Sequence, residues 1–221
     1  MKVAIDFGIS NTDIAVSNNA NVDFFTIPST KINHLILDEI FEQINIDIGL
    51  IDRIAVTGGK SDSLESIYKT IEVLKINETD AIGNGVIEIY NTHEPFVAIS
   101  AGTGTACIYH QDGEFNYIGG IAIGGGTIKG LSNLALNNSS LDELTKKALL
   151  GNRDNIDLLI GDVVNDIGVL NPSVTASNFA KLKKGDDVSE NDVAAAIFNM
   201  IGEVIGTIAY LNAAVCGTVS Y

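Results

Sequence analysis

Apolar and polar residues alternate along the first part of the chain in three short runs, which are separated by Gly, Asn and Ser. A period of two residues is typical of half-buried β-strands. Strands are therefore expected at residues 2–6, 13–17 and 22–26. Over residues 32–48 the apolar positions recur at helical spacing instead, which predicts a helix.

The same two periods continue to the end of the chain. The segment "DRIAVTGG" predicts a buried strand that is stopped by paired glycines. The further elements expected are a helix at 62–69, an extended segment at 71–76, a helix at 79–91, strands at 96–100, 105–110 and 115–119, and helices at 127–136, 140–150, 155–165 and about 190–214. Ser189 is expected to cap the last helix, with Asp192 completing a capping box. Hairpins, crossovers and helices in this order describe an α/β fold with mixed β-sheets.

Composition and charge narrow the class of protein. Of the 221 residues 46% are hydrophobic and 19% charged, with a net charge of −15, which predicts a globular protein and argues against nucleic-acid or anionic-membrane partners. Apolar stretches are broken before a membrane-spanning length and no signal peptide is visible, so we expect a cytoplasmic protein without a membrane partner. Cys107 and Cys216 are expected as free thiols, and the isolated histidines predict no metal cluster.

The turn "SAGTGTA" carries two threonines where a hairpin needs none. Glycines let the backbone turn its N–H groups toward an anion, and Thr103 and Thr105 add hydroxyl donors. Taken alone, the motif favours an ordinary hairpin turn, because short glycine motifs arise often by chance.

Three companion features favour phosphate chemistry. Asp6 ends the first strand, where it either holds Mg²⁺ through water or initiates a turn. The glycines at 124–126 precede a helix whose free N–H groups attract phosphate, unless they form a flexible connector. Glu78 stands where a strand gives way to a helix, and it either accepts a proton from an alcohol that attacks ATP or favours the helix start.

Seven motifs in order resemble type II pantothenate kinases over nearly the whole chain: "VAIDFGIS", "VTGG", "NETDA", "SAGTGTA", "IGGIAIGGGTIKGL", "GNRDNIDL" and "TASNF". The resemblance implies an actin-like (ribonuclease H-like) two-lobed kinase fold, which we divide into an N-terminal lobe at 1–95 and a C-terminal lobe at 96–221. It also implies ATP- and Mg²⁺-dependent phosphorylation of pantothenate to 4'-phosphopantothenate, the first step of coenzyme A biosynthesis, by a homodimer.

The family's site residues carry over by position. Glu78 matches the catalytic glutamate and Asp6 the magnesium-organising aspartate. The positions expected to contact nucleotide phosphates are Asp6, Gly8, Ser10, Gly102, Thr103, Gly104, Gly124, Gly125 and Gly126. The positions expected to contact pantothenate are Glu78, Thr103, Thr105 and Tyr117.

The chain departs from the family pattern at several positions. Ile9 and Ser10 stand where the family has Gly-Thr, and Asp13 stands where a basic residue is common. Tyr117 replaces an arginine that grips the pantothenate carboxylate, and a hydroxyl donates only a neutral hydrogen bond. The family continues with a segment that completes the adenosine side, whereas this chain ends at Tyr221, so either the sequence is shortened or the nucleotide pocket is open or built otherwise.

Two alternatives to pantothenate phosphorylation follow from these departures. The same fold would serve a kinase for another small acceptor such as an N-acylamino sugar, which the altered Tyr117 favours. A non-catalytic ATP-binding relative is the other alternative, against which the retention of Glu78 and both glycine turns argues.

Overall fold

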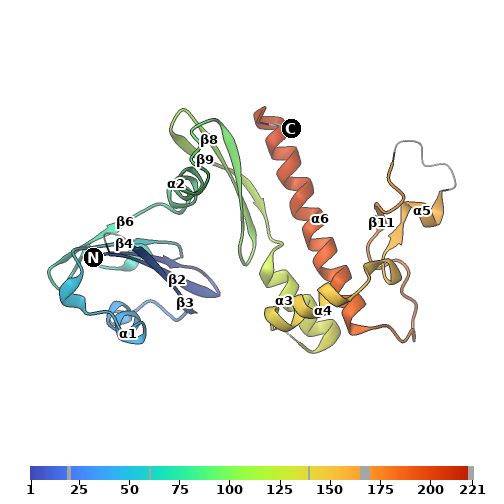
Figure 1. The fold of residues 1–221 in the computed structure, drawn as a ribbon, viewed down its shortest axis with the longest axis horizontal. Coiled ribbons are helices and arrows are strands. Elements are labelled where there is room, and N and C mark those ends of the chain that lie inside the picture. The colour runs from blue at the N-terminus through green and yellow to red at the C-terminus, as the bar shows by residue number, and fades with distance from the viewer. Residues whose placement is uncertain (19–20, 60, 139, 165–169, 219–221) are drawn as a thin grey trace. The chain divides into compact units, whose positions relative to one another are not determined.

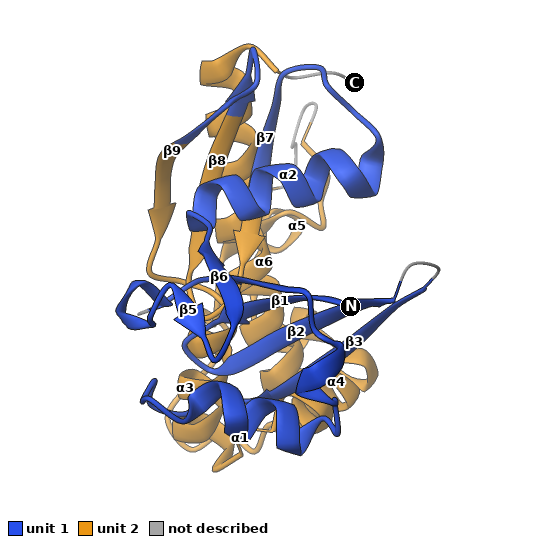
Figure 2. Ribbon diagram, turned by 90° about the vertical axis from the view of Figure 1, so that its left-hand side faces the viewer, with its two compact units in different colours: residues 1–98, 110–116 blue, residues 99–109, 117–221 orange. Residues whose placement is uncertain are grey.

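A computed structural model describes residues 1–18, 21–59, 61–138, 140–164 and 170–218 (Figure 1). The chain divides into two compact units, residues 1–98 with 110–116 and residues 99–109 with 117–221 (Figure 2). Tyr221, the last residue of the chain, lies outside the described residues.

Unit 1 is built on a six-stranded sheet in the order β3-β2-β1-β4-β6-β5. The strands are β1 (Lys2–Phe7), β2 (Asn11–Asn18), β3 (Asn21–Pro28), β4 (Arg53–Thr57), β5 (Ile67–Tyr68) and β6 (Ile71–Lys75). β1 pairs antiparallel with β2 and parallel with β4, and β4 pairs parallel with β6, so the expected mixed sheet is confirmed.

One face of this sheet is the core of unit 1. Alternate residues of β1, β2 and β4 are buried, as the sequence period predicts. They pack in one cluster with the buried residues of helix α1 (Ile36–Gln43), which are Ile36, Leu37, Ile40 and Phe41. The helix is shorter than expected because Asn45 adopts a left-handed conformation with φ 55°.

The helix predicted at 62–69 is wrong. The chain forms a short 3₁₀ turn, η2 (Ser61–Ser63), and then the edge strand β5. Leu64, Ile67 and Tyr68 have helical spacing, but only Leu64 and Tyr68 pack against the core, from a bend and a strand, while Ile67 is 62% exposed. Lys69, with φ 55°, turns the chain back into β6.

The next elements are helix α2 (Glu78–Tyr90) and a sheet in the order β7-β8-β9. Its strands are β7 (Phe96–Ala101), β8 (Thr105–Gln111) and β9 (Glu114–Ile121). β8 and β9 form a hairpin through Asp112 and Gly113, whose φ angles of 53° and 83° give the right-handed twist that two-residue hairpins require. All the strands predicted here are confirmed.

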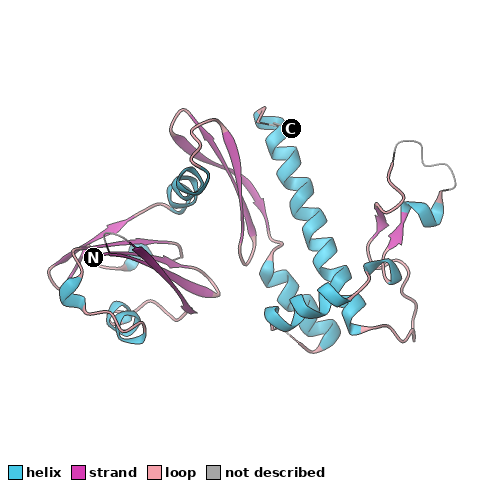
Figure 3. Cartoon of the chain, viewed as in Figure 1, coloured by secondary structure: helices cyan, strands magenta, loops and turns pink. Residues whose placement is uncertain are grey.

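From residue 125 onward, most of the regular structure of unit 2 is helical (Figure 3). Its helices are α3 (Gly125–Leu136), α4 (Leu141–Leu150), α5 (Ile160–Val163) and α6 (Glu190–Cys216), with η3 (Arg153–Asn155) and the short strands β10 (Leu158–Leu159) and β11 (Thr175–Ser177). The helix predicted at 155–165 is largely wrong, since η3, β10 and α5 share that segment and position 165 lies outside the described residues. Asp157 lies between η3 and β10 and is not helical, and its carboxylate accepts a hydrogen bond from the Phe179 amide at 2.8 Å.

α6 is the long helix that the sequence predicts. Ser189 accepts a hydrogen bond from the Asn191 amide, but Asp192 completes no capping box; its carboxylate accepts from the Asn152 amide at 2.7 Å instead. Among the described helices α6 is the one long and apolar enough to cross a membrane, with a mean hydropathy of 1.6 over 18 residues, which the sequence analysis did not anticipate. Its residues Val193, Ala196 and Ile197 pack in a core cluster of unit 2.

Candidate active site

Asp6 lies near the end of β1, on the sheet face opposite the core. In register, Asp6 is paired with Asp13 on β2 and with Thr57 on β4. The Asp13 carboxylate accepts a hydrogen bond from the Thr26 hydroxyl at 2.6 Å. The buried Thr57 hydroxyl has no hydrogen-bond partner among the described residues. Asp6 therefore has a second carboxylate and an unsatisfied hydroxyl as its closest neighbours across the strands.

Two glycines after β4 make room for the Asp6 carboxylate and the following backbone. An added Cβ at Gly58, whose φ is 76°, would lie 2.2 Å from Asp6 Oδ1. One at Gly59 would lie 2.6 Å from the carbonyl oxygen of Phe7. In the sequence, "VTGG" marks the end of a strand and is one of the family motifs, but nothing there assigned these two glycines to the site.

The turn that follows Asp6 is fastened by Ser29. The Ser29 hydroxyl donates to the carbonyl of Gly8 at 2.7 Å, and its amide donates to the carbonyl of Ser10 at 3.1 Å. A Cβ at Gly8 would lie 2.6 Å from the carbonyl oxygen of Asn11, so the tight turn requires glycine there. Ile9 is 81% exposed at the tip of the turn. No feature of the local sequence pattern points to Ser29, which follows β3.

Glu78 is the first residue of α2, in the same unit as Asp6. Asn77 caps the helix, since its side chain accepts from the amide and the hydroxyl of Thr79 at 2.9 and 2.7 Å. The helix start thus has its own capping residue. The exposed Glu78 carboxylate is not needed for that purpose.

The acids around Asp6 set its protonation and its fitness for a cation. Burial raises the pKa of Asp6 above its usual value, and the charges of Glu78 and Asp13 raise it further. A divalent cation would offset this accumulation of negative charge, and an oxygen ligand such as Asp6 is what Mg²⁺ prefers. In the part of the chain that the structure describes, no group of three His, Cys, Asp or Glu side chains is arranged to hold a metal. Asp6 alone fits a Mg²⁺ ion that takes its other ligands from water and phosphate.

The second glycine turn, between β7 and β8, packs directly on the start of α3 within unit 2. The amides of Gly125 and Gly126 donate to the carbonyls of Gly102 and Thr103 at 2.8 and 3.0 Å. A Cβ at Gly124 would lie 2.8 Å from the carbonyl oxygens of both Gly102 and Gly104. The two glycine motifs that the sequence places far apart therefore form one structure.

This packing corrects the physical reason for expecting phosphate at α3. Free N–H groups were expected at the helix start, but the amides of Gly125 and Gly126 are already bonded to the turn. Thr105 also serves the fold: it is buried, and its hydroxyl donates to the carbonyl of Ile123 at 2.7 Å. The close approach of the turn and the helix explains why glycines occupy 124–126.

Tyr117 on β9 is 61% exposed. Its hydroxyl lies near Gly120, where an added Cβ would be 2.8 Å from Tyr117 Oη and 2.5 Å from the carbonyl oxygen of Thr105. The phenol is thus on the surface of unit 2, over the glycines that adjoin the second turn.

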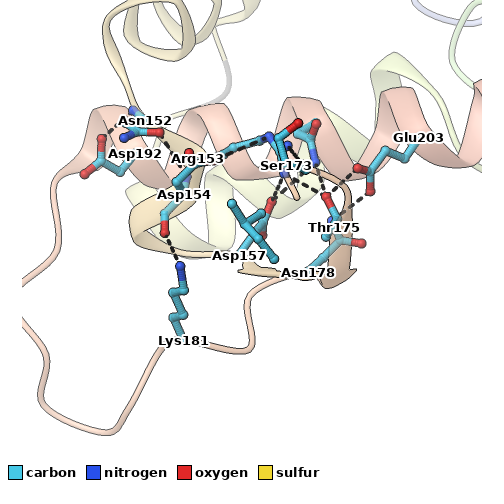
Figure 4. A network of polar contacts seen from close by, with 12 residues as sticks. Asn152, Arg153, Asp154, Asp157, Ser173, Thr175, Asn178, Lys181, Asp192 and Glu203 are labelled. Carbon is cyan, nitrogen blue, oxygen red and sulfur yellow. Dashed lines mark hydrogen bonds and ion pairs between the residues drawn. The ribbon is translucent and has the colours of Figure 1, made fainter. Parts of the chain in front are cut away.

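The motifs "GNRDNIDL" and "TASNF" meet in a polar network on α6 (Figure 4). Arg153 donates to the Thr175 hydroxyl and the Ser173 carbonyl, both at 2.7 Å, and its guanidinium lies 3.6 Å from the fully buried carboxylate of Asp157. Glu203 on α6 accepts from Thr175 at 2.5 Å. The sequence alone assigns these motifs no role, and the network shows that they hold residues 153–157 and 173–178 against α6.

Comparison with known proteins gives consistent matches. The sequence profile of the Fumble family matches residues 86–220. A type II pantothenate kinase from Bacillus anthracis is 31% identical over 212 residues, which cover 92% of this chain and 74% of that protein. Pantothenate kinase 1 from Arabidopsis thaliana is 37% identical over 134 residues, which cover 56% of this chain and 35% of that protein.

Solved structures match at lower identity. The activator of the 2-hydroxyisocaproyl-CoA dehydratase from Clostridium difficile, with bound ADPNP, has a TM-score of 0.59 at 13% identity and covers 94% of this chain and 74% of its own. A putative 2-dehydro-3-deoxygalactonokinase from Sinorhizobium meliloti has a TM-score of 0.53 at 11% identity, covering 95% of this chain and 81% of its own. These likenesses show the expected actin-like fold.

Proposed function

The chain belongs to the Fumble family of type II pantothenate kinases, and from this premise we propose that it transfers the terminal phosphoryl group of ATP to the hydroxyl of pantothenate. The product is 4'-phosphopantothenate, and the reaction is the first step of coenzyme A biosynthesis. The observation that carries the proposal is the family match, together with the placement of Asp6 near the end of β1 and of Glu78 at the start of α2 in one unit.

We propose one role for each of the two acids, in line with the family resemblance. Glu78 accepts the proton of the acceptor hydroxyl while that oxygen bonds to the terminal phosphorus of ATP, and the bond from phosphorus to the bridging oxygen breaks to release ADP. Asp6 would hold Mg²⁺, which when bound would neutralise phosphate charge. Gly58 leaves the space that the Asp6 carboxylate occupies. Catalysis of this kind depends mainly on position and charge.

We assign phosphate contacts to the turns of both units, at Gly8 and Ser10 in one and at Gly102, Thr103 and Gly104 in the other. The fastening of the first turn by Ser29 and the packing of the second on α3 support this assignment, because a preorganised turn loses little freedom on binding. For the glycines at 124–126 we propose support of the second turn beside the nucleotide.

Tyr117 is the proposed contact for the pantothenate carboxylate, and Thr103 for the rest of the acceptor. Thr105, expected from the resemblance to share that role, is buried and donates its hydroxyl to the Ile123 carbonyl, so we propose that it supports the turn instead. The exposed phenol of Tyr117 suits a single neutral hydrogen bond. The same hydroxyl would also suit an uncharged acceptor, so a kinase for an N-acylamino sugar is the second candidate. Consumption of ATP with pantothenate, pantetheine, N-acetylglucosamine and no acceptor separates these candidates from a non-catalytic relative.

We further propose a homodimer that works in the cytoplasm. The family resemblance supports the dimer, as do the exposed apolar residues in the last turns of α6, where Tyr210, Leu211 and Val215 are 61%, 51% and 87% exposed. Sedimentation equilibrium of the whole chain tests the oligomeric state.

Glu78→Gln is the sharpest test of the chemistry. The amide keeps the size of the side chain but cannot accept the proton, so kcat with pantothenate is expected to fall about 10²–10⁴-fold. The melting temperature should change little, because Asn77 caps the helix. Glu88→Gln, at an exposed position in the last turns of α2, is the matched control and should keep wild-type kcat. A Glu78→Gln variant with kcat within a few-fold of the wild-type value removes Glu78 from the mechanism.

A further inference from the structure

α2 rests on an aromatic ring through a glycine. Among the residues of α2, all of which lie in the described part of the chain, Gly83 alone is buried. An added Cβ at Gly83 would lie 2.1 Å from Cδ1 and 2.3 Å from Cε1 of Phe115 on β9. Since Cβ contacts below 3.0 Å essentially do not occur, even one methyl group here would force the ring or the helix to move by about 1 Å.

The ring of Phe115 is itself held in place. His110 on β8 is 2% exposed, and its ring centroid lies 5.0 Å from that of Phe115. His110 also stacks on Phe96 of β7, with centroids 4.7 Å apart and an interplanar angle of 25°. The Asp112-Gly113 turn fixes the pairing of β8 with β9. The three rings therefore form a supported platform, and all of them belong to unit 1 together with α2.

We propose that Gly83 and Phe115 are positioning residues that set the place of α2 and thereby that of the Glu78 carboxylate at its first turn. The inference rests on the role proposed for Glu78. Gly83 is five positions after Glu78 in one continuous helix, a rise of about 7.5 Å along the axis, so a shift at the glycine is carried to the carboxylate. A misplacement of about 1 Å at a reacting group can cost about 10²-fold in rate.

The test compares two glycines of one helix. Gly83→Ala is expected to lower kcat by about 10–100-fold while the KM for ATP changes less than about threefold. Gly85→Ala is the matched control, because an added Cβ there would have no described atom within 4 Å beyond its chain neighbours and the adjacent helix backbone. Its kcat should stay within about twofold of wild type. A folded Gly83→Ala variant with kcat within about twofold of wild type overturns the inference.

Variants of Phe115 complete the test. In the double variant Gly83→Ala with Phe115→Ala, the loss in kcat should be smaller than the product of the two single losses, since the methyl group no longer meets the ring. Phe115→Leu keeps an apolar side chain without the flat ring, and it should lower kcat by about 3–10-fold. If Gly83→Ala does not fold, Phe115→Leu decides, and kcat within about twofold of wild type contradicts the proposal.

Amide hydrogen exchange separates this inference from the proposed function, because it needs no turnover. Gly83→Ala should speed exchange in residues 78–90 and 110–116 together, and Gly85→Ala should not. If the wild-type protein phosphorylates no acceptor, the proposed function is wrong, while the exchange data still test the contact. Unchanged exchange in Gly83→Ala refutes the contact whatever the activity.

Discussion

Arg153 faces one buried and one exposed carboxylate, and removing each in turn isolates the effect of burial. Asp157 is fully buried and lies 3.6 Å from Nη1 of Arg153. Asp154 is 48% exposed and lies 3.9 Å from Nε of the same residue. We predict that Asp157→Ala destabilises the protein strongly and that Asp154→Ala, its matched control, hardly does so.

The magnitudes follow from the contacts. Removing one partner of a buried ion pair costs about 3–5 kcal/mol, because the remaining charge loses its partner in a medium that solvates it poorly. Asp157→Ala also leaves the Phe179 amide without its acceptor. An exposed pair contributes about 0–1 kcal/mol, which is the expected cost of Asp154→Ala. Asp157→Asn keeps an acceptor but loses the charge, so its cost should lie between the two.

Urea unfolding followed by far-UV circular dichroism measures these costs, with the slope of the transition checked against wild type. For a chain of this length the expected loss for Asp157→Ala corresponds to a melting temperature about 6–20 °C lower. Faster amide exchange in α6 would locate the damage at the network of Figure 4. If Asp157→Ala and Asp154→Ala differ by less than about 1 kcal/mol, the reasoning from burial is refuted.

Three further predictions change a charged or hydrogen-bonding group at Asp6, Glu203 or Tyr117. Asp6→Asn should abolish kinase activity and raise the melting temperature at pH 7. The melting temperature should rise because burial and the charges of Glu78 and Asp13 raise the pKa of Asp6, so that its ionised form is unfavourable in the folded protein. An unchanged or lower melting temperature contradicts this. Burial raises the pKa of Glu203, but hydrogen bonds from Thr175, Asn178 and Asn199 with the charge of Arg153 outweigh it, so the net pKa is lowered from 4.5. The ionised Glu203 carboxylate therefore stabilises the fold above pH 4.5, and this stabilisation is lost as the pH falls through the lowered pKa. Between pH 7 and lower pH, Glu203→Gln should lose less unfolding free energy than wild type. Equal losses would exclude the role of Glu203. Tyr117→Arg should lower the KM for pantothenate in steady-state assays by restoring a charged partner for its carboxylate, and an unchanged KM would show that the carboxylate is bound elsewhere.

The period of the hydrophobic residues was sufficient to predict the secondary structure where one face of an element is buried. β1, β2 and β4 alternate strictly because a single sheet face meets the core, and α6 is long enough to average over local exceptions. The segment 62–69 has the spacing of a helix face, yet it forms an edge strand because Tyr68 packs on Phe41, with ring centroids 5.8 Å apart. That contact joins residues far apart in the chain, and no local pattern contains it.

The candidate site shows the same division. Family motifs identified Asp6, Glu78 and the two glycine turns, but the sequence contains no local signal for what holds them. Ser29 braces the first turn from the end of another strand, and Gly58 adjoins Asp6 only because β1 and β4 pair in parallel. Asp192 has the spacing of a capping box, but its carboxylate accepts a hydrogen bond from the Asn152 amide, which lies outside the helix.

The division of the chain into units has a consequence for how the protein can be dissected. The chain passes from one unit to the other within each of β7, β8 and β9, so neither unit is a continuous stretch of sequence. A fragment that ends at Ala98 would contain Glu78 and the whole of α2 but would lack Phe115. The helix would then expose the backbone around Gly83 to water and lose its support. An N-terminal fragment that retains the contact of Gly83 with Phe115 and all of unit 1 extends through Asn116. Limited proteolysis should cleave that fragment less readily than one that ends at Ala98.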